Sequence, residues 1–174
     1  MRASQSILLI TLLLGCQPVL RGIYQDLPIP TGPVARHDER QARELLNEGG
    51  EAMGAREWEA AEQRFLQALT IRQTIFGPQS LQIAECKLRV SQAMLQQGHF
   101  NRALPLLSSV RSAILADRSE NPETRAEIAF DAALVFSRIG HAVYADEMFR
   151  EAHKISSSTL GVEHIDTQIG RAHV

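Results

Sequence analysis

Side chains that could carry out catalysis or bind a metal ion are few in this chain, and their spacing does not group them. The sequence of 174 residues contains two cysteines and six histidines. His99 and His141 lie 42 residues apart and each directly follows a glycine, so they occupy equivalent turns and do not converge on a metal ion. Cys86 has only distant histidines, which is no basis for a thiol nucleophile. We therefore expect no enzyme activity, no metal site and no cofactor.

Phosphate and nucleic-acid binding are also not predicted. Gly49, Gly50 and Gly54 lack the following lysine and hydroxyl residue that complete a phosphate loop. Glu57 and Glu59 read as the solvated first turn of a helix, where the helix dipole favours negative charge. The chain carries 18 basic and 20 acidic residues, for a net charge of −2. This balance lacks the clustered basic face that nucleic-acid binding requires.

Cys16 has a different chemistry, which the residues before it indicate. A positive start at Arg2 precedes an apolar run over residues 7–14, which is too short to span a bilayer but has the length of a signal-peptide core. Leu13-Leu14-Gly15-Cys16 resembles the bacterial lipobox. The resemblance implies a signal peptide over residues 1–15 and a lipid on Cys16. The alternative is an ordinary signal peptide or an uncleaved anchor with an incidental cysteine.

Residues 16–35 are rich in proline, which removes the backbone donor that a helix needs, so we expect an extended tether there. Gln17 is not the aspartate that usually marks retention in the inner membrane. If the source is Gram-negative, the resemblance therefore implies an exported protein anchored in the outer membrane and facing the periplasm.

The remainder of the chain matches itself at a spacing of 42 residues. The recurring positions include Ala61, Ala103 and Ala145; Phe65, Leu107 and Phe149; and Ala42, Ala84 and Ala126. Within residues 81–116, two apolar faces at helical spacing are separated by Gly98, which predicts a helical hairpin. A fixed period of this kind predicts an all-α array in which each unit packs against its neighbours.

This pattern resembles the tetratricopeptide repeat (TPR) family in its 42-residue, kinesin-light-chain-like form. The motif runs Trp58-Glu59-Ala60-Ala61-Glu62, then Phe65, then Phe76-Gly77-Pro78, with echoes around Tyr144, Phe149 and Leu160-Gly161. The resemblance implies a right-handed superhelical array of antiparallel helix hairpins, a TPR-like solenoid over residues 36–167. Its repeats would cover about residues 36–78, 79–121 and 122–164, followed by the start of a fourth.

The first unit departs from the pattern in two places. Glu48 stands where Val90 and Ala132 occur in the later units, and Arg56 replaces the loop glycine. We therefore expect the first helix to be frayed or to act as a cap.

In the TPR family the first helix of each hairpin lines a concave groove that binds extended peptides. The candidate groove residues that the repeat register carries over are Arg43, Asn47, Glu85, Arg89, Gln92, Glu127 and Asp131, with Leu46, Gly50, Leu88, Phe130 and Leu134 at adjoining positions. Asn47 keeps the family's backbone-holding asparagine, whereas Arg89 and Asp131 replace it, which indicates a charge-patterned partner or none. Leu88 and Phe130 would alternatively pack between repeats, and Arg89 and Asp131 would be plain solvated residues.

The last seven residues break the repeat. The alanines at 84 and 126 predict another at 168, where Gln168 stands instead. Residues 168–174 match the translation of a common sequencing-adapter string, including its stop codon. We therefore expect residues 168–174 to be a non-native tail and the parent protein to be longer. The alternative is a natural short C-terminus.

The sequence thus predicts a membrane-tethered scaffold that binds a protein or peptide and needs no cofactor. One alternative is the regulatory repeat region of a larger enzyme, and another is a stacking element of an envelope complex that binds nothing in its groove.

Overall fold

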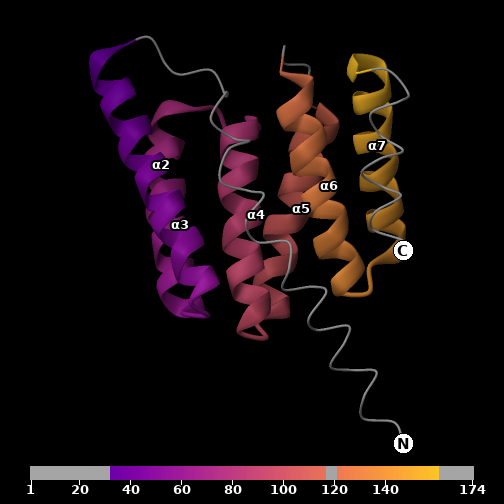
Figure 1. Cartoon of the computed structure of the whole chain (residues 1–174), viewed down its shortest axis with the longest axis horizontal. Helices are drawn as coiled ribbons and strands as arrows, with labels where there is room; N and C mark the ends of the chain where they lie inside the picture. Colours follow the sequence, from indigo (N-terminus) through magenta and orange to yellow (C-terminus); the bar gives the residue numbers. More distant parts are fainter. Residues whose placement is uncertain (1–31, 117–120, 161–174) are drawn as a thin grey trace, which may run out of the picture.

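A computed structural model describes residues 32–116 and 121–160, and these residues form six α-helices and no strand (Figure 1). The helices are α2 (Pro33–Gly54), α3 (Trp58–Ile75), α4 (Leu81–Gln96), α5 (Phe100–Ala116), α6 (Pro122–Arg138) and α7 (Ala142–Leu160). The predicted all-α class is confirmed. The predicted signal peptide, Cys16, most of the tether, the start of a fourth unit and the tail at 168–174 lie outside the described residues.

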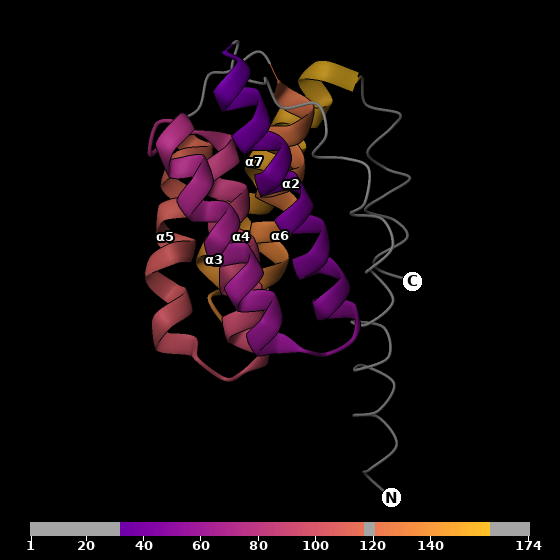
Figure 2. The ribbon, with the colours of Figure 1, turned by 90° about the vertical axis from the view of Figure 1, so that its left-hand side faces the viewer.

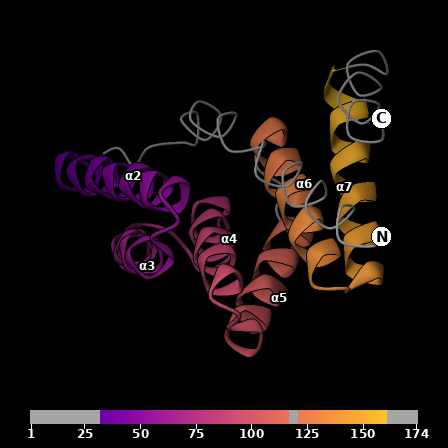
Figure 3. The same cartoon turned by 60° about the horizontal axis from the view of Figure 1, so that its bottom comes forward.

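The helices stand side by side in chain order as hairpins 1 (α2–α3), 2 (α4–α5) and 3 (α6–α7). The first helices α2, α4 and α6 lie on one side of the row, and the second helices α3 and α5 lie on the other (Figure 3). Seen from the α2 end, α3 and α4 lie between α2 and α5 (Figure 2). Each helix packs against its neighbours in the chain, and α6 also contacts α4.

Helix α2 begins at Pro33, which corrects the predicted start at residue 36. Proline excludes a helix only where its missing N–H or its ring interferes with the preceding turn. At the first helical position its fixed φ is favourable, and no intrahelical donor is lost. Pro122 is likewise the first residue of α6, where the Asn121 side chain accepts a hydrogen bond of 3.3 Å from the backbone N–H of Thr124.

The turns inside the three hairpins share one backbone conformation, at the same repeat position. Arg56, Gly98 and Gly140 have φ of 63°, 79° and 78°. The next residue in each turn donates its N–H to the carbonyl five positions earlier: Glu57 to Ala52, His99 to Met94 and His141 to Phe136, all at 2.9 Å. This bond is typical of a helix that ends in a left-handed residue. The 42-residue period therefore fixes the turn even where an arginine replaces glycine.

We expect Arg56→Gly to raise the free energy of unfolding by about 0.5–1 kcal/mol, because a side chain at positive φ is strained and glycine is not. Urea denaturation followed by circular dichroism measures this change. Gly98→Ala is the matched control and should lower stability by about 1 kcal/mol. An Arg56→Gly chain no more stable than the wild type would show that Arg56 is not strained.

Hairpin 1 carries charges where the other hairpins are apolar. Arg64 pairs with Glu48 at 3.1 Å, and both side chains are about half exposed. The equivalent pairs are apolar members of the core, Val90 with Leu106 and Ala132 with Met148. Helix α2 is continuous from Pro33 to Gly54, so it is not frayed. A polar outer position on an unbroken helix agrees with the cap interpretation, since a terminal repeat needs a polar outer face.

Candidate functional site

Helix α4 is buried along most of its length, and its remaining exposure is confined to a few positions. Arg89, Gln92 and Gln96 are half-buried and follow one another at spacings of three and four residues, which is one strip of the helix. Arg89 and Gln92 are two of the predicted groove residues. Leu88 is buried in the core between hairpins 2 and 3, as its packing interpretation predicts.

Corresponding strips occur on the neighbouring first helices. On α2, Asn47 is exposed and Arg43 is half-buried. On α6, Glu127 and Asp131 are half-buried and one turn apart. Because α2, α4 and α6 lie on the same side of the row (Figure 3), the three strips form one surface, which we call the first-helix side. Phe130 packs edge-on against Phe149, with ring centroids 5.5 Å apart, and so helps to join α6 to α7.

Glu85 does not belong to this surface. Its side chain is only 3 % exposed, and its carboxylate accepts a hydrogen bond of 2.6 Å from Nη1 of Arg72 on α3. A side chain buried in this way has no surface left for a ligand to contact, so the structure does not support the predicted groove role of Glu85. Six of the seven predicted groove residues are exposed or half-buried.

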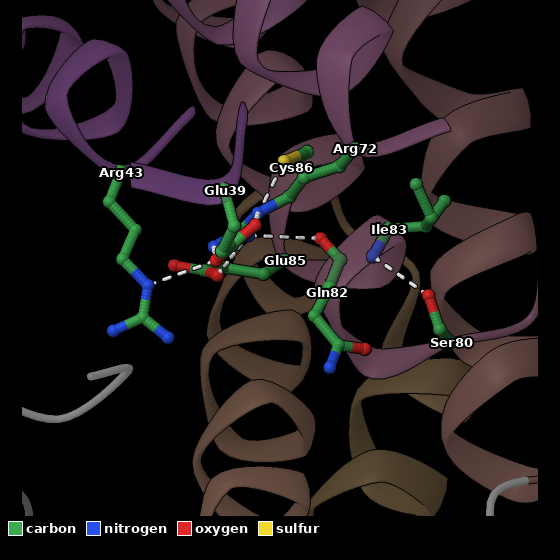
Figure 4. Close-up of polar contacts among 8 residues, drawn as sticks. All are labelled: Glu39, Arg43, Arg72, Ser80, Gln82, Ile83, Glu85 and Cys86. Carbon is green, nitrogen blue, oxygen red and sulfur yellow. Dashed lines mark hydrogen bonds and ion pairs between the residues drawn. The ribbon is translucent and has the colours of Figure 1, made fainter. Parts of the chain in front are cut away.

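Arg72 lies at the centre of a buried ionic cluster that joins α2, α3 and α4 (Figure 4). Its Nε and Nη2 donate to the two carboxylate oxygens of Glu39 at 3.1 and 2.8 Å, and its Nη1 also donates to the Gln82 carbonyl at 3.2 Å. Arg43 Nε donates to Glu39 at 2.9 Å from the edge of the cluster. The sequence analysis missed Glu39 and Arg72, which connect the first-helix side to the interior.

The charge of Arg72 is compensated by its neighbours. Burial alone would lower the pKa of Arg72, but the charges of Glu85, Cys86 and Glu39 and the hydrogen bond to Glu39 outweigh it, and the pKa is raised. Paired, hydrogen-bonded charges of this kind are the form in which an arginine tolerates the interior. The cluster therefore holds the first two hairpins together and does not present a reactive group.

Cys86 is a free, buried cysteine whose sulfur lies 3.6 Å from Nη1 of Arg72. Burial raises the pKa of its thiol to about 12, although the nearby Arg72 charge acts in the opposite direction. A thiol protonated at neutral pH and shielded from solvent is a small packing residue, not a nucleophile. This agrees with the expectation from sequence.

We expect Cys86 in a Cys16→Ser chain to react with iodoacetamide at pH 8 at least about 10³-fold more slowly in the folded state than in urea. The folded pKa of about 12 exceeds the ordinary value of 9.0, so the thiolate is scarce. Because this pKa is raised on folding, the thiol's contribution to stability is complete below about pH 9 and is lost as pH rises toward 12. Mass spectrometry follows the alkylation, and equal rates in the two states would contradict the burial of this thiol.

Charges on the second helices form ion pairs between successive hairpins. Arg102 of α5 donates to Glu62 of α3 at 2.7 Å. Arg111 of α5 forms a two-pronged pair with Glu147 of α7, with one bond of 2.8 Å, and lies 5.0 Å from the ring centroid of Tyr144. The second helices are thus linked to one another by side chains that already serve as structural contacts.

The described ranges contain no group of three or more His, Cys, Asp or Glu side chains placed to hold a metal ion. His141 stacks on Tyr144 and His99 contacts Arg102, both at the hairpin turns that their spacing predicts. Within these same ranges, no helix has the length and apolar content to cross a membrane.

Comparison with protein-family models, with curated proteins and with solved structures finds no match to this chain. Its function is therefore argued from its own residues.

Proposed function

We propose that this chain is a protein-interaction module whose first-helix side binds an extended segment of a partner protein. One observation carries the proposal. Asn47, Arg89 and Asp131 occupy the same repeat position on α2, α4 and α6, and each retains exposure on a helix that is otherwise packed against its neighbours. A row of polar side chains at a constant repeat position suits the regularly spaced groups of an extended peptide.

The proposed architecture is a right-handed TPR-like stack, and two features support it. The recurring left-handed turn at positions 56, 98 and 140 gives each hairpin the same internal connection. The recurring alanines Ala61, Ala103 and Ala145 are all buried, which lets neighbouring helices approach closely at equivalent points. Equal units joined in equal ways generate a regular array.

The test is selection of peptides from a random library against the whole chain, followed by affinity measurements with variants. We expect Asn47→Ala and Arg89→Ala each to weaken the selected peptides several-fold. Asn101→Ala and Arg150→Ala make the same chemical changes at exposed positions of α5 and α7, and should leave affinity unchanged. If binding tolerates Arg89→Ala and Asp131→Ala together, the first-helix side is not the binding surface, and a purely structural role is favoured.

We further propose that the module is exported and held at a membrane by a lipid on Cys16, on the basis of the lipobox-like residues before it. Metabolic labelling with a fatty acid in a bacterial host should mark the wild-type chain and not Cys16→Ser. Equal labelling of the two chains would refute lipidation.

A further inference from the structure

The first-helix side has a basic strip at its α2 end. Arg36 and Arg40 are exposed, Arg43 is half-buried, and spacings of four and three residues place them along one strip of the helix. The buried residues Ala42, Gly49 and Met53 mark a different face of α2, which packs against the rest of the protein.

An acidic strip lies at the α6 end. Glu123 is exposed and Glu127 and Asp131 are half-buried, with four residues between successive members. The nearest basic residue on this helix, Arg125, lies on another face, 3.9 Å from Glu151 of α7. The two strips occupy the N-terminal parts of helices that run in the same direction, so they face each other across α4 (Figures 1 and 3).

Helix α4 separates the strips with side chains of weaker charge. Its exposure on this side comes from Arg89 and from two neutral amides, Gln92 and Gln96. The surface therefore changes from basic on α2, through a mainly neutral centre, to acidic on α6. A surface with this order of charges favours a ligand with the complementary order, because matched potentials steer encounter and like charges placed together are costly.

We propose that the first-helix side binds an extended peptide of bipolar charge, with acidic residues over α2, neutral residues over α4 and basic residues over α6. This inference rests on the proposed function and names the chemistry of the partner. Two interhelical spacings of about 8–10 Å separate the strips. An extended chain rises about 3.3 Å per residue, so about five or six residues should lie between its acidic and basic ends.

The probe is a synthetic peptide with a run of aspartates and a run of lysines separated by about six neutral residues. Its control has the same composition, but its acidic and basic residues alternate. Fluorescence anisotropy on the whole chain at low ionic strength should show about tenfold tighter binding of the bipolar peptide. The difference should shrink as salt is added. Equal affinity for the two peptides, or binding of neither, overturns the proposal.

Charge-reversal variants locate the interaction. Arg36→Glu with Arg40→Glu should weaken the bipolar peptide about tenfold. Adding Glu123→Lys with Glu127→Lys should restore binding, since the peptide can then lie in the opposite direction. Arg150→Glu on α7 is the matched control and should change nothing. Circular dichroism checks that each variant remains folded. No loss on reversing α2, or a loss equal to that of Arg150→Glu, overturns the proposal.

Two other outcomes would assign the strips differently. Concentration-dependent association of the chain that the α2 reversal abolishes would place the acidic strip of a second copy on the basic strip, and would overturn the peptide proposal. If library-selected peptides bind the first-helix side with no order in their charges, the proposed function stands and this inference fails.

Discussion

Replacing Arg72 by leucine is expected to lower the free energy of unfolding by about 3–5 kcal/mol. The substitution would leave the carboxylates of Glu39 and Glu85 in the interior, where they are 2 % and 3 % exposed, without the guanidinium that binds both. The cost of an uncompensated buried charge exceeds any gain from the added apolar side chain. Urea denaturation at pH 7 measures the loss, and a variant as stable as the wild type would contradict the role of Arg72.

Hairpin 2 supplies the control for this experiment. The positions equivalent to Glu39 and Arg72 are Leu81 and Ile114, which lie together in the apolar core. We therefore expect Glu39→Leu, Arg72→Ile and Glu85→Leu in combination to recover most of the loss, to within about 1–2 kcal/mol of the wild type, because no charge is then stranded. If the triple variant is as unstable as Arg72→Leu, the loss comes from packing and not from charge.

The helices and turns were predictable because the information for them is local and repeated. The apolar residues of α4 and α5 recur at helical spacing around Gly98, and the same pattern occurs three times. Repetition also explains why the replacement of glycine by Arg56 does not change the turn. The hydrogen bond from Glu57 to Ala52 matches its counterparts in the other hairpins, and packing of the two helices imposes the conformation.

The ionic cluster was not predictable in the same way, because its members lie on three helices. Arg72 and Glu39 are 33 residues apart, and no local pattern pairs them. The repeat register placed Glu85 in the groove, but it took no account of an arginine on α3 where hairpin 2 has Ile114. A usable signal was present: positions 39 and 72 are both charged in hairpin 1, and both equivalents are apolar in hairpin 2. Positions that change character together in this way are candidates for contact.

Gly49→Ala is expected to lower the free energy of unfolding by about 1–2 kcal/mol, although helix propensity alone predicts a gain of about 0.5–1 kcal/mol. A Cβ on Gly49 would lie 2.4 Å from Cε1 and 2.6 Å from Cδ1 of Phe65. That ring is only 1 % exposed in the core of hairpin 1, so it cannot move aside freely. Gly50→Ala is the matched control: its Cβ would meet nothing within 4 Å, and helix propensity should then raise stability.

Hairpin 2 again indicates how the effect can be reversed. It carries Ser91 at the position of Gly49 and Leu107 at the position of Phe65, and both are fully buried. A Cβ is therefore tolerated where the facing side chain lacks an aromatic ring. Phe65→Leu should cost stability alone, but in combination with Gly49→Ala the two losses should be clearly less than additive, because the smaller side chain removes the clash. Strict additivity in a double-mutant cycle would mean that Phe65 is not what keeps position 49 a glycine.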